Sequence, residues 1–374
     1  MSLEPINLSA TPLSATSVLL EWESATSVVG SDGVSYHFWQ IPCSVKEYDE
    51  DIGFSVLRNQ LSDGYRRRTL YGSNTGLRGF KLTMPTLAGS SGSGFVTGIS
   101  GEEVTKEEYL WSLYCECEST GVPFVIESQR NNQYYLVEFV NERLSYSRFL
   151  TKLYSTGVDL IQVRIDGVSV FQPSRVNGLF GYWDADTAFV SDIWAGTDGS
   201  TGTPDLEKAG DVIDVAAAVN GHQIKRFNNS ANTGHVSGNL PSGVVYDLII
   251  AMKMREGSFS NDCGIFVDIA NGIDFILGDS GTTKFQTSGF STDNFSYFLN
   301  GQEYAINNLQ APMNTWGICH FRNLDGWNVP DGLFLMTSTA SARAEADVGD
   351  IVMLSKPSLQ TCREITEQMM VKWL

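Results

Sequence analysis

The segment VVYDLIIAMKMR (244–255) has a regular apolar alternation that indicates the fold class of this chain. Its apolar side chains recur at every second position, namely Tyr246, Leu248, Ile250, Met252 and Met254. A period of two places these side chains on one face of a β-strand. The stretch also contains the longest apolar run of the chain, and Asp247 and Lys253 interrupt it. We therefore expect a buried strand here and no insertion into a membrane.

Short apolar segments of the same kind follow along the second half of the chain. They are GIFVDIA (264–270), IDFIL (273–277), FSYFL (295–299), TWGICHFR (315–322), GLFLMTS (332–338) and GDIVMLS (349–355). Asn-Gly pairs after Ala270 and Leu299 are typical of hairpin turns. Many short strands joined by Gly- and Asp-rich connections predict a jelly-roll sandwich.

A short helix is expected to close this sandwich at the end of the sequence. Thr361 and Glu364 have the spacing of a capping box, which predicts the start of the helix. The apolar residues that follow form one helical stripe, made of Cys362, Ile365, Met369 and Trp373. We expect this stripe to pack against the sandwich.

The first half of the chain predicts a β domain with one helix. Thr105 and Glu108 form a capping box, and Leu110, Trp111, Tyr114 and Cys117 follow at helical spacing. Gly121 is a typical helix end. The Gly/Ser-rich stretch 88–101 predicts a mobile loop. We expect a barrel or sandwich over 1–172, a linker over 173–176 and the jelly roll over 177–374, so the fold class is mainly β.

The composition excludes some functions. The chain has 374 residues, with 43 acidic against 25 basic residues and a formal net charge of −18. Nucleic-acid binding needs a basic surface that neutralises phosphates, so no nucleic-acid partner is expected. The first residues show no basic stretch followed by an apolar core, so we expect no signal peptide. The six cysteines are expected to be free thiols in a reducing cytosol.

Motifs within 35–165 stand in the order found in the phage distal tail and minor tail protein M group. LSDGYRRR (61–68) resembles the F-G-D-G-Y-x-x-R segment of that group, with Leu61 in place of the usual aromatic residue. GSN (72–74) stands where the family has G-x-N. The helix and the turn ESTGVPF (118–124) resemble the family's helix and turn. The resemblance implies a domain that builds a ring at the tip of a phage tail.

The region 177–374 resembles the concanavalin A/laminin-G type of lectin domain. GLFGYWDADTA (178–188) is similar to the opening strand of that family, and SYFLNGQEY (296–304) is similar to one of its hairpins. GDIVMLSKPSL (349–359) resembles the return strand, and EITEQMMVKWL (364–374) resembles the closing helix. The resemblance implies a module that binds glycans or cell surfaces.

Two segments contain the residue types that bind sugars. Exposed aromatic rings stack on pyranose faces, and Asp and Asn side chains bind the hydroxyl groups. RNLDGWNVPDG (322–332) and DIWAGTDGSTGTPD (192–205) supply the candidates Arg322, Asp325, Trp327, Asn328, Asp331, Trp194, Asp198 and Asp205. Alternatively, both tryptophans cover the edge of the core and the Asp residues cap turns. A structural Ca²⁺ held by the Asp residues also stays open, because no ligand spacing defines it.

Arg66, Arg67 and Arg68 form the one dense basic run of this acidic chain. On a strand, Arg66 and Arg68 would face the same way. In a ring they could pair with acidic residues of a neighbouring subunit, for which the candidates are Asp49, Glu50 and Asp51. The alternative is a basic face in contact with solvent.

Nothing in the sequence matches a known catalytic motif. It contains no phosphate-binding loop, no H-E-x-x-H and no G-x-S-x-G, and its four histidines are scattered. Retaining glycosidases use two carboxyl groups about 5 Å apart, and no strand here offers such a pair. We therefore expect no catalytic residues, no enzymatic activity and no cofactor.

Taken together, the two resemblances predict a structural protein of a bacteriophage tail tip or baseplate. We expect a ring of three or six copies, assembled in the host cytoplasm and located in the virion tail. Its expected partners are the tail tube and hub proteins and a glycan of the host cell surface, which the second domain would bind during adsorption. The alternatives are a free carbohydrate-binding lectin with an accessory β domain and, less favoured, a polysaccharide-degrading enzyme.

Overall fold

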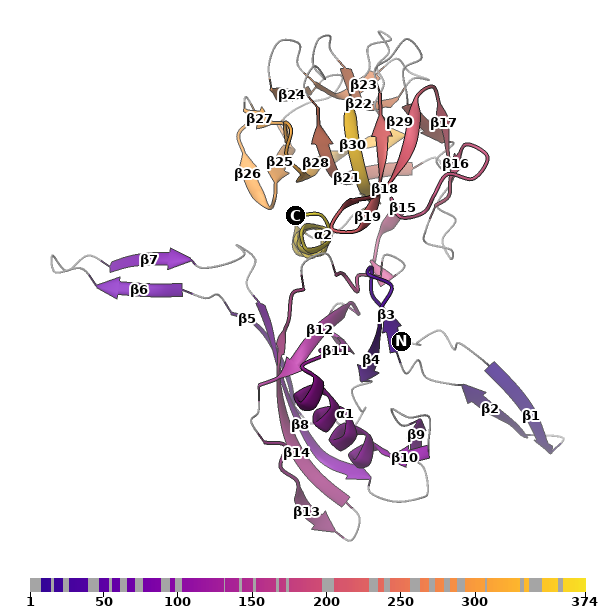
Figure 1. Ribbon diagram of the computed structural model, residues 1–374, viewed down its shortest axis with the longest axis vertical. Coiled ribbons are helices and arrows are strands. Elements are labelled where there is room, and N and C mark those ends of the chain that lie inside the picture. The colour runs from indigo at the N-terminus through magenta and orange to yellow at the C-terminus, as the bar shows by residue number, and fades with distance from the viewer. Residues whose placement is uncertain are drawn as a thin grey trace. The chain divides into compact units, whose positions relative to one another are not determined.

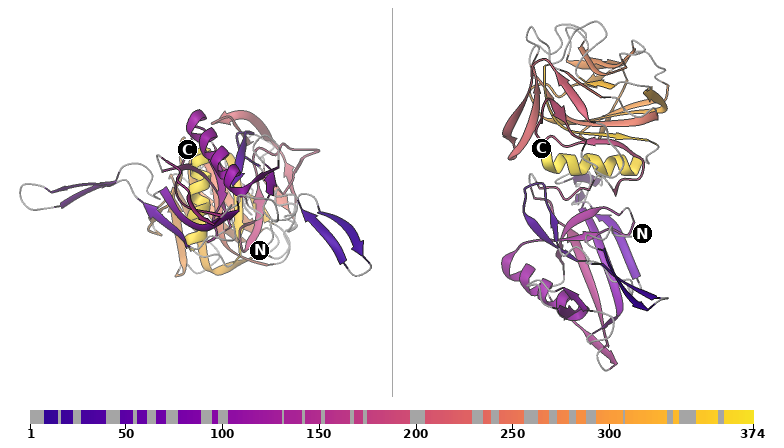
Figure 2. Two further views of the ribbon diagram at one scale, coloured as in Figure 1. Left: turned by 90° about the horizontal axis from the view of Figure 1, so that it is seen from below. Right: turned by 90° about the vertical axis from the view of Figure 1, so that its right-hand side faces the viewer.

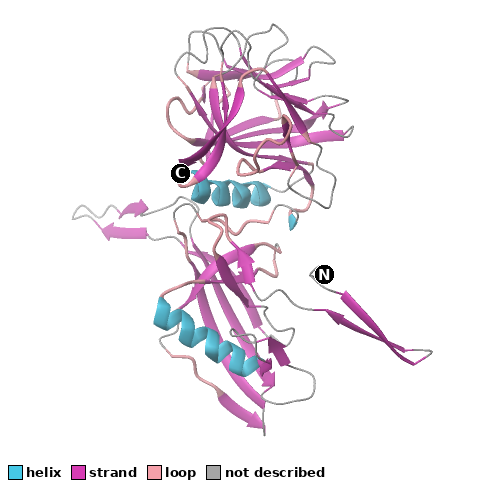
Figure 3. Cartoon of the chain, turned by 45° about the vertical axis from the view of Figure 1, so that its right-hand side comes forward, coloured by secondary structure: helices cyan, strands magenta, loops and turns pink. Residues whose placement is uncertain are grey.

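The computed structural model divides the chain into two compact units, Met1–Arg164 and Ile165–Leu374. The division precedes the linker expected at 173–176. Strands dominate both units (Figure 3), which confirms the mainly β class. The structure describes residues 8–14, 17–22, 27–39, 47–53, 56–60, 66–70, 77–88, 95–97, 103–130, 132–140, 143–150, 153–165, 168–172, 175–196, 205–228, 235–238, 243–255, 263–268, 273–278, 283–287, 293–306, 308–329, 333–335, 345–355 and 359–374.

Unit 1 is built on one mixed sheet that stays open (Figure 1). Its strands pair antiparallel except for β4 and β11, which run parallel. The sequence left both a barrel and a sandwich open for this unit. The described strands form no closed barrel. In spatial order the strands are β3 (Ser27–Val29), β4 (Ser35–Trp39), β11 (Phe124–Glu127), β12 (Tyr134–Phe139), β14 (Leu153–Gln162), β8 (Leu77–Ala88) and β5 (Glu47–Gly53), with β13 (Ser147–Leu150) beside β14.

Helix α1 (Lys106–Thr120) packs on this sheet and begins and ends where the sequence predicts. The Thr105 hydroxyl accepts a hydrogen bond from the Glu108 backbone N–H, and the Glu108 carboxylate accepts one from the Thr105 backbone N–H. Gly121 ends the helix with a left-handed φ of 67°. The predicted capping box and helix end are therefore confirmed.

The buried face of α1 differs by one position from the predicted stripe. Leu110 and Cys117 are buried as expected, but Leu113 completes the row and Trp111 is 48% exposed. Each residue advances about 100° around a helix, so Trp111 points away from the sheet when Leu110 points toward it. The ring of Trp111 instead lies near the rings of Tyr114 and Tyr146.

Three antiparallel ribbons in unit 1 form separate two-stranded sheets (Figure 1). They are β1 (Leu8–Ser14) with β2 (Ser17–Trp22), β6 (Val56–Gln60) with β7 (Arg66–Leu70), and β9 (Phe95–Thr97) with β10 (Glu103–Thr105). The ribbon β9–β10 corrects the prediction of a loop over 88–101, because Phe-Val-Thr is a β-prone segment that pairs with a neighbour. Residues 89–94 and 98–101 of that stretch lie outside the described residues.

Unit 2 is a sandwich of two antiparallel sheets, as the strand pattern predicts. The first, called the β21 sheet, has the order β18 (Val212–Val219), β19 (His222–Phe227), β30 (Ala346–Leu354), β21 (Gly243–Met254), β28 (Gly317–Val329), β25 (Phe295–Leu299) and β26 (Gln302–Tyr304), with β15 (Leu179–Trp183) beside β30. The second has the order β16 (Ile193–Trp194), β17 (Leu206–Ala209), β20 (His235–Gly238), β29 (Leu333–Leu335), β22 (Cys263–Asp268), β23 (Ile273–Gly278), β24 (Lys284–Thr287) and β27 (Leu309–Gln310).

Strand β21 lies near the middle of its sheet and is buried on both faces. The predicted apolar face is buried from Leu248 to Met254, whereas Tyr246 is half-buried because the register shifts between Val245 and Asp247. The opposite face of the strand is also buried, which the alternating pattern did not predict. Helix α2 (Leu359–Trp373) packs against β21 and β28 (Figure 2) and covers this face.

The apolar stripe of α2 is confirmed, since Cys362, Ile365, Met369 and Trp373 are all buried. The capping box predicted at Thr361 and Glu364 is wrong. The helix begins at Leu359, so Thr361 already lies in its first turn, and Glu364 accepts a hydrogen bond from the Gln360 side chain instead. Among the described residues, no helix combines the length and apolar character that a membrane crossing requires.

Candidate functional site

The segment 322–332, predicted to be a sugar-binding loop, is largely part of β28. Trp327 is 1% exposed and its ring lies against Phe266 in the core of unit 2. A ring buried in this way cannot stack on a sugar, so the role predicted for Trp327 is corrected. The segment instead forms a long strand, and its indole fills the core of the sandwich. This agrees with the alternative interpretation, in which the tryptophan covers the core and does not bind sugar.

The polar residues of the same segment do not form one site. Arg322 turns toward Asp247, with its Nε 3.8 Å from the Asp247 Oδ1. Asp325 is exposed and accepts a hydrogen bond from the Asn294 side chain at 2.9 Å. Asn328 pairs with Val244 in the sheet, and its side chain lies outside the described residues, as does the whole of Asp331.

The second predicted segment, 192–205, also places its aromatic residue in the core. Trp194 is fully buried, and its Nε1 donates a hydrogen bond of 2.8 Å to the Asp184 carbonyl. Asp205 is exposed and accepts a hydrogen bond from the Gly196 backbone N–H at 3.2 Å, which is a turn-capping role. Asp198 lies outside the described residues. The stacking role of Trp194 is therefore corrected too.

The acidic residues predicted for a subunit interface lie on β5. Glu50 is not available to a neighbouring subunit, because its side chain is 3% exposed and forms an ion pair with Arg78. It also accepts hydrogen bonds from Tyr48 and Ser128. Asp49 is exposed, and the side chain of Asp51 lies outside the described residues.

The basic run of the predicted interface lies on a strand. Arg66, Arg67 and Arg68 begin β7 and pair with Gln60, Asn59 and Arg58 of β6. Their side chains lie outside the described residues.

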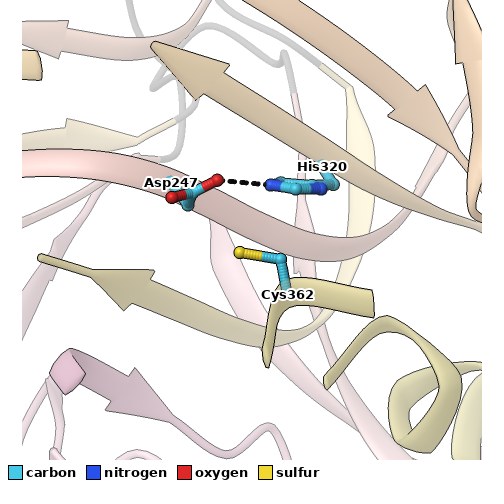
Figure 4. A group of neighbouring side chains, drawn as sticks. All are labelled: Asp247, His320 and Cys362. Carbon is cyan, nitrogen blue, oxygen red and sulfur yellow. Dashed lines mark hydrogen bonds and ion pairs between the residues drawn. The ribbon is translucent and has the colours of Figure 1, made fainter. Parts of the chain in front are cut away.

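Asp247, His320 and Cys362 form a buried cluster between the β21 sheet and α2 (Figure 4). They come from β21, β28 and the first turn of α2, and their exposed fractions are 0%, 2% and 0%. The His320 Nε2 lies 2.6 Å from the Asp247 Oδ1. One ligand-type atom from each of the three residues lies within 4.8 Å of the other two.

The strand register explains why these side chains meet. Asp247 pairs with Arg322 and Ile249 pairs with His320, so Asp247 and His320 are diagonal neighbours on the face that α2 covers. Phe298 pairs with His320 from the other side, and its ring stacks on the imidazole with centroids 5.0 Å apart.

Two buried polar atoms of this cluster have no hydrogen-bond partner. The Asp247 Oδ2 and the Arg322 Nη1 are both buried and neither has a hydrogen-bond partner. Burial raises the pKa of the Cys362 thiol above its usual range, and the negative charge of Asp247 adds to this shift. The cluster therefore combines a neutral thiol, an imidazole and a carboxylate beside a guanidinium group.

Sequence reasoning missed this cluster. In the sequence Asp247 is an isolated acid in an apolar strand, and His320 and Cys362 lie far from it along the chain. The one available signal was the acid itself, because a carboxylate within a buried strand requires a partner.

A second polar network, also missed, joins α2 to the start of unit 2. The Lys372 Nζ lies 3.0 Å from Asp184, 3.0 Å from Asp186 and 3.1 Å from Asp350. Asp186 in addition contacts the His222 Nδ1 at 2.8 Å. The motif WDAD (183–186), which resembles the lectin opening strand, thus binds the end of α2 in this structure.

Comparisons with known proteins give only distant likeness. No family model and no curated protein matches the chain. Among solved structures, it is similar to a cycloalternan-forming enzyme from Listeria monocytogenes, with 9% identity, a TM-score of 0.25 and coverage of 86% of this chain and 23% of that one. It is also similar to the Trypanosoma rangeli sialidase, with 10% identity, a TM-score of 0.28 and coverage of 80% and 53%.

A third similar structure is an exo-β-1,3-galactanase from Phanerochaete chrysosporium, with 9% identity, a TM-score of 0.23 and coverage of 81% of this chain and 69% of that one. The chain spans about a quarter of the first enzyme and about half of the sialidase. All three are carbohydrate-active enzymes, and none is a phage tail protein. TM-scores this low carry no argument about activity.

Proposed function

We propose that this chain is a structural protein of a bacteriophage tail tip or baseplate, in which unit 1 assembles a ring and unit 2 is a glycan-binding type of module. The observation that carries the proposal is the ribbon β6–β7. Its two strands pair only with each other among the described strands, and β7 begins with three consecutive arginines.

A ribbon of this kind favours a partner. An isolated two-stranded hairpin is at best marginally stable in water, because it has no hydrophobic face to bury. A second copy of the chain can supply that face, and Asp49 on β5 offers an exposed carboxylate to the arginines. When such a contact joins two different surfaces of identical subunits, it builds a ring if the rotations from one subunit to the next add up to a full turn.

Unit 2 supports the second half of the proposal through its sandwich architecture. In a ring, several copies of a weakly binding module would act together on a host surface glycan, and multivalency raises the overall affinity. The protein would be located in the virion tail after assembly in the host cytoplasm, with the tail tube and hub proteins as further partners. We propose no catalytic role, because the Asp247, His320 and Cys362 side chains are buried away from any polymeric substrate.

The test compares the full chain with a charge-reversed variant by sedimentation. We expect Arg66→Glu/Arg67→Glu/Arg68→Glu to lose the oligomer that the wild type forms. The control, Arg130→Glu/Arg143→Glu, changes two exposed arginines of the same unit and should keep it. A triple variant that assembles like the wild type would remove the ribbon from the interface.

Location is tested on virions of the source phage with an antibody raised against the full chain. Gold label at the tail end supports the proposal, and label-free tails contradict it. A monomer that binds a defined sugar on a glycan array would instead favour the free lectin.

A further inference from the structure

We infer that Asp247, His320 and Cys362 bind one divalent metal ion of the zinc type between the β21 sheet and α2. This inference is independent of the proposed function. It rests on the chemistry of the three donors, on their placement within 4.8 Å of one another and on a buried carboxylate oxygen that has no partner.

The donor set selects the class of metal. A thiolate, an imidazole and a carboxylate are all common zinc ligands, at about 2.0–2.3 Å from the ion. Ca²⁺ and Mg²⁺ prefer oxygen ligands, so a site with sulfur and nitrogen disfavours both. Three protein ligands leave one tetrahedral position for a water molecule or a small anion.

The distances suit a site that needs little rearrangement. Ligand atoms around a tetrahedral ion lie roughly 3–4 Å apart, as follows from those bond lengths. The Cys362 Sγ lies within 4.8 Å of the other two ligand atoms and would move toward the ion by at most about 1–2 Å, while Asp247 and His320, now hydrogen-bonded at 2.6 Å, would separate slightly. Figure 4 shows the three side chains converging from their separate elements.

The unpartnered Asp247 Oδ2 is the second, independent observation. Buried polar atoms without any partner are rare in folded proteins and need an explanation, such as an ion. Asp247 is fully buried, so bulk water does not serve this oxygen. A metal ion would give the carboxylate a second interaction, and Arg322 beside it would then act as an outer partner that orients this ligand.

Metal binding at this site should stabilise the fold of unit 2. The ligands come from two strands and a helix that are far apart in sequence, so the site exists only in folded unit 2. Metal binding is then coupled to folding and stabilises the attachment of the first turn of α2.

The experiment titrates the full chain, stripped with a chelator, with Co²⁺ as a probe and then with Zn²⁺. We expect one equivalent of Co²⁺ to give a thiolate-to-cobalt charge-transfer band, which Zn²⁺ removes, and Zn²⁺ to raise the Tm. Cys362→Ser should lose the band, and Asp247→Asn should weaken binding by about tenfold or more. The control Cys115→Ser removes an exposed thiol of unit 1 and should bind like the wild type.

Two results overturn the inference. One is a wild type with neither the band nor a rise in Tm, and the other is a band that survives in Cys362→Ser. Should Cys362→Ser fail to fold, alkylation of the wild type decides, carried out in urea just below the unfolding transition so that local opening exposes the buried Cys362 thiol. Protection of Cys362 by Zn²⁺ supports the site, and equal labelling of Cys362 with and without Zn²⁺ contradicts it.

Discussion

The ammonium group of Lys372 lies among Asp184, Asp186 and Asp350, and these carboxylates raise its pKa above the usual range despite burial. Lys372→Met would leave Asp350 buried without its counter-ion. Removing one partner of a buried pair costs about 3–5 kcal/mol. We predict a loss of this size in the free energy of unfolding, measured with urea and tryptophan fluorescence. The exposed Lys81→Met is the control and should stay within about 0.5 kcal/mol of the wild type.

Asp350 gives a prediction about pH at the same scale. Burial raises the pKa of Asp350 to about 6, with Asp184 adding to the shift and Lys372 opposing it. A carboxyl with a higher pKa in the folded chain takes up a proton on folding. Its contribution to stability is therefore present below about pH 4 and is lost as pH rises to about 6, on the order of 2–3 kcal/mol.

The measurement compares the wild type with Asp350→Asn at pH 4.5 and pH 6.5. Asn does not titrate. The free energy of unfolding should therefore fall less between pH 4.5 and pH 6.5 in the variant than in the wild type. The same change in both proteins would show that Asp350 has an ordinary pKa.

At the scale of single elements, α1 depends on its N-terminal cap. The Thr105 hydroxyl accepts a hydrogen bond of 3.2 Å from the Glu108 backbone N–H, which gives a partner to one of the N–H groups that the first turn leaves unpaired. We predict that Thr105→Ala lowers the free energy of unfolding of unit 1 by about 1 kcal/mol. Thr105→Ser keeps the hydroxyl and should retain most of that stability in thermal unfolding followed by circular dichroism. An equal loss in both variants would point to lost packing of the methyl group.

Elements set by local rules were predictable from sequence, and the candidate site was not. The α1 capping box, the Gly121 end and the α2 stripe depend on residues within one or two turns of each other. The burial of Trp194 and Trp327 depends on which strands pair, and an indole in an Asp-rich segment has the same local pattern whether it is exposed or buried.

The Asp247 cluster shows the same limit more sharply. Asp247, His320 and Cys362 meet only because two strands pair in one register and a helix closes over them. The network of Lys372 likewise joins residues at opposite ends of unit 2. Contacts of this kind follow from tertiary structure and leave no periodic trace in the sequence.

At the scale of the whole molecule, the proposed function requires self-association through unit 1. The chain is acidic overall, with a formal net charge of −18, so association requires local complementarity. Ribbon β6–β7 concentrates positive charge on one strand, whereas Glu50 is already neutralised by Arg78 within its own unit. In the proposed ring, the exposed Asp49 would be the acidic partner of these arginines.

The most direct measurement of this claim is the mass of the purified full chain in solution, by mass photometry over a range of concentrations. We predict a closed ring of three or six copies of the 41.1 kDa chain, with no larger open series. A single species at 41.1 kDa at every concentration would contradict it.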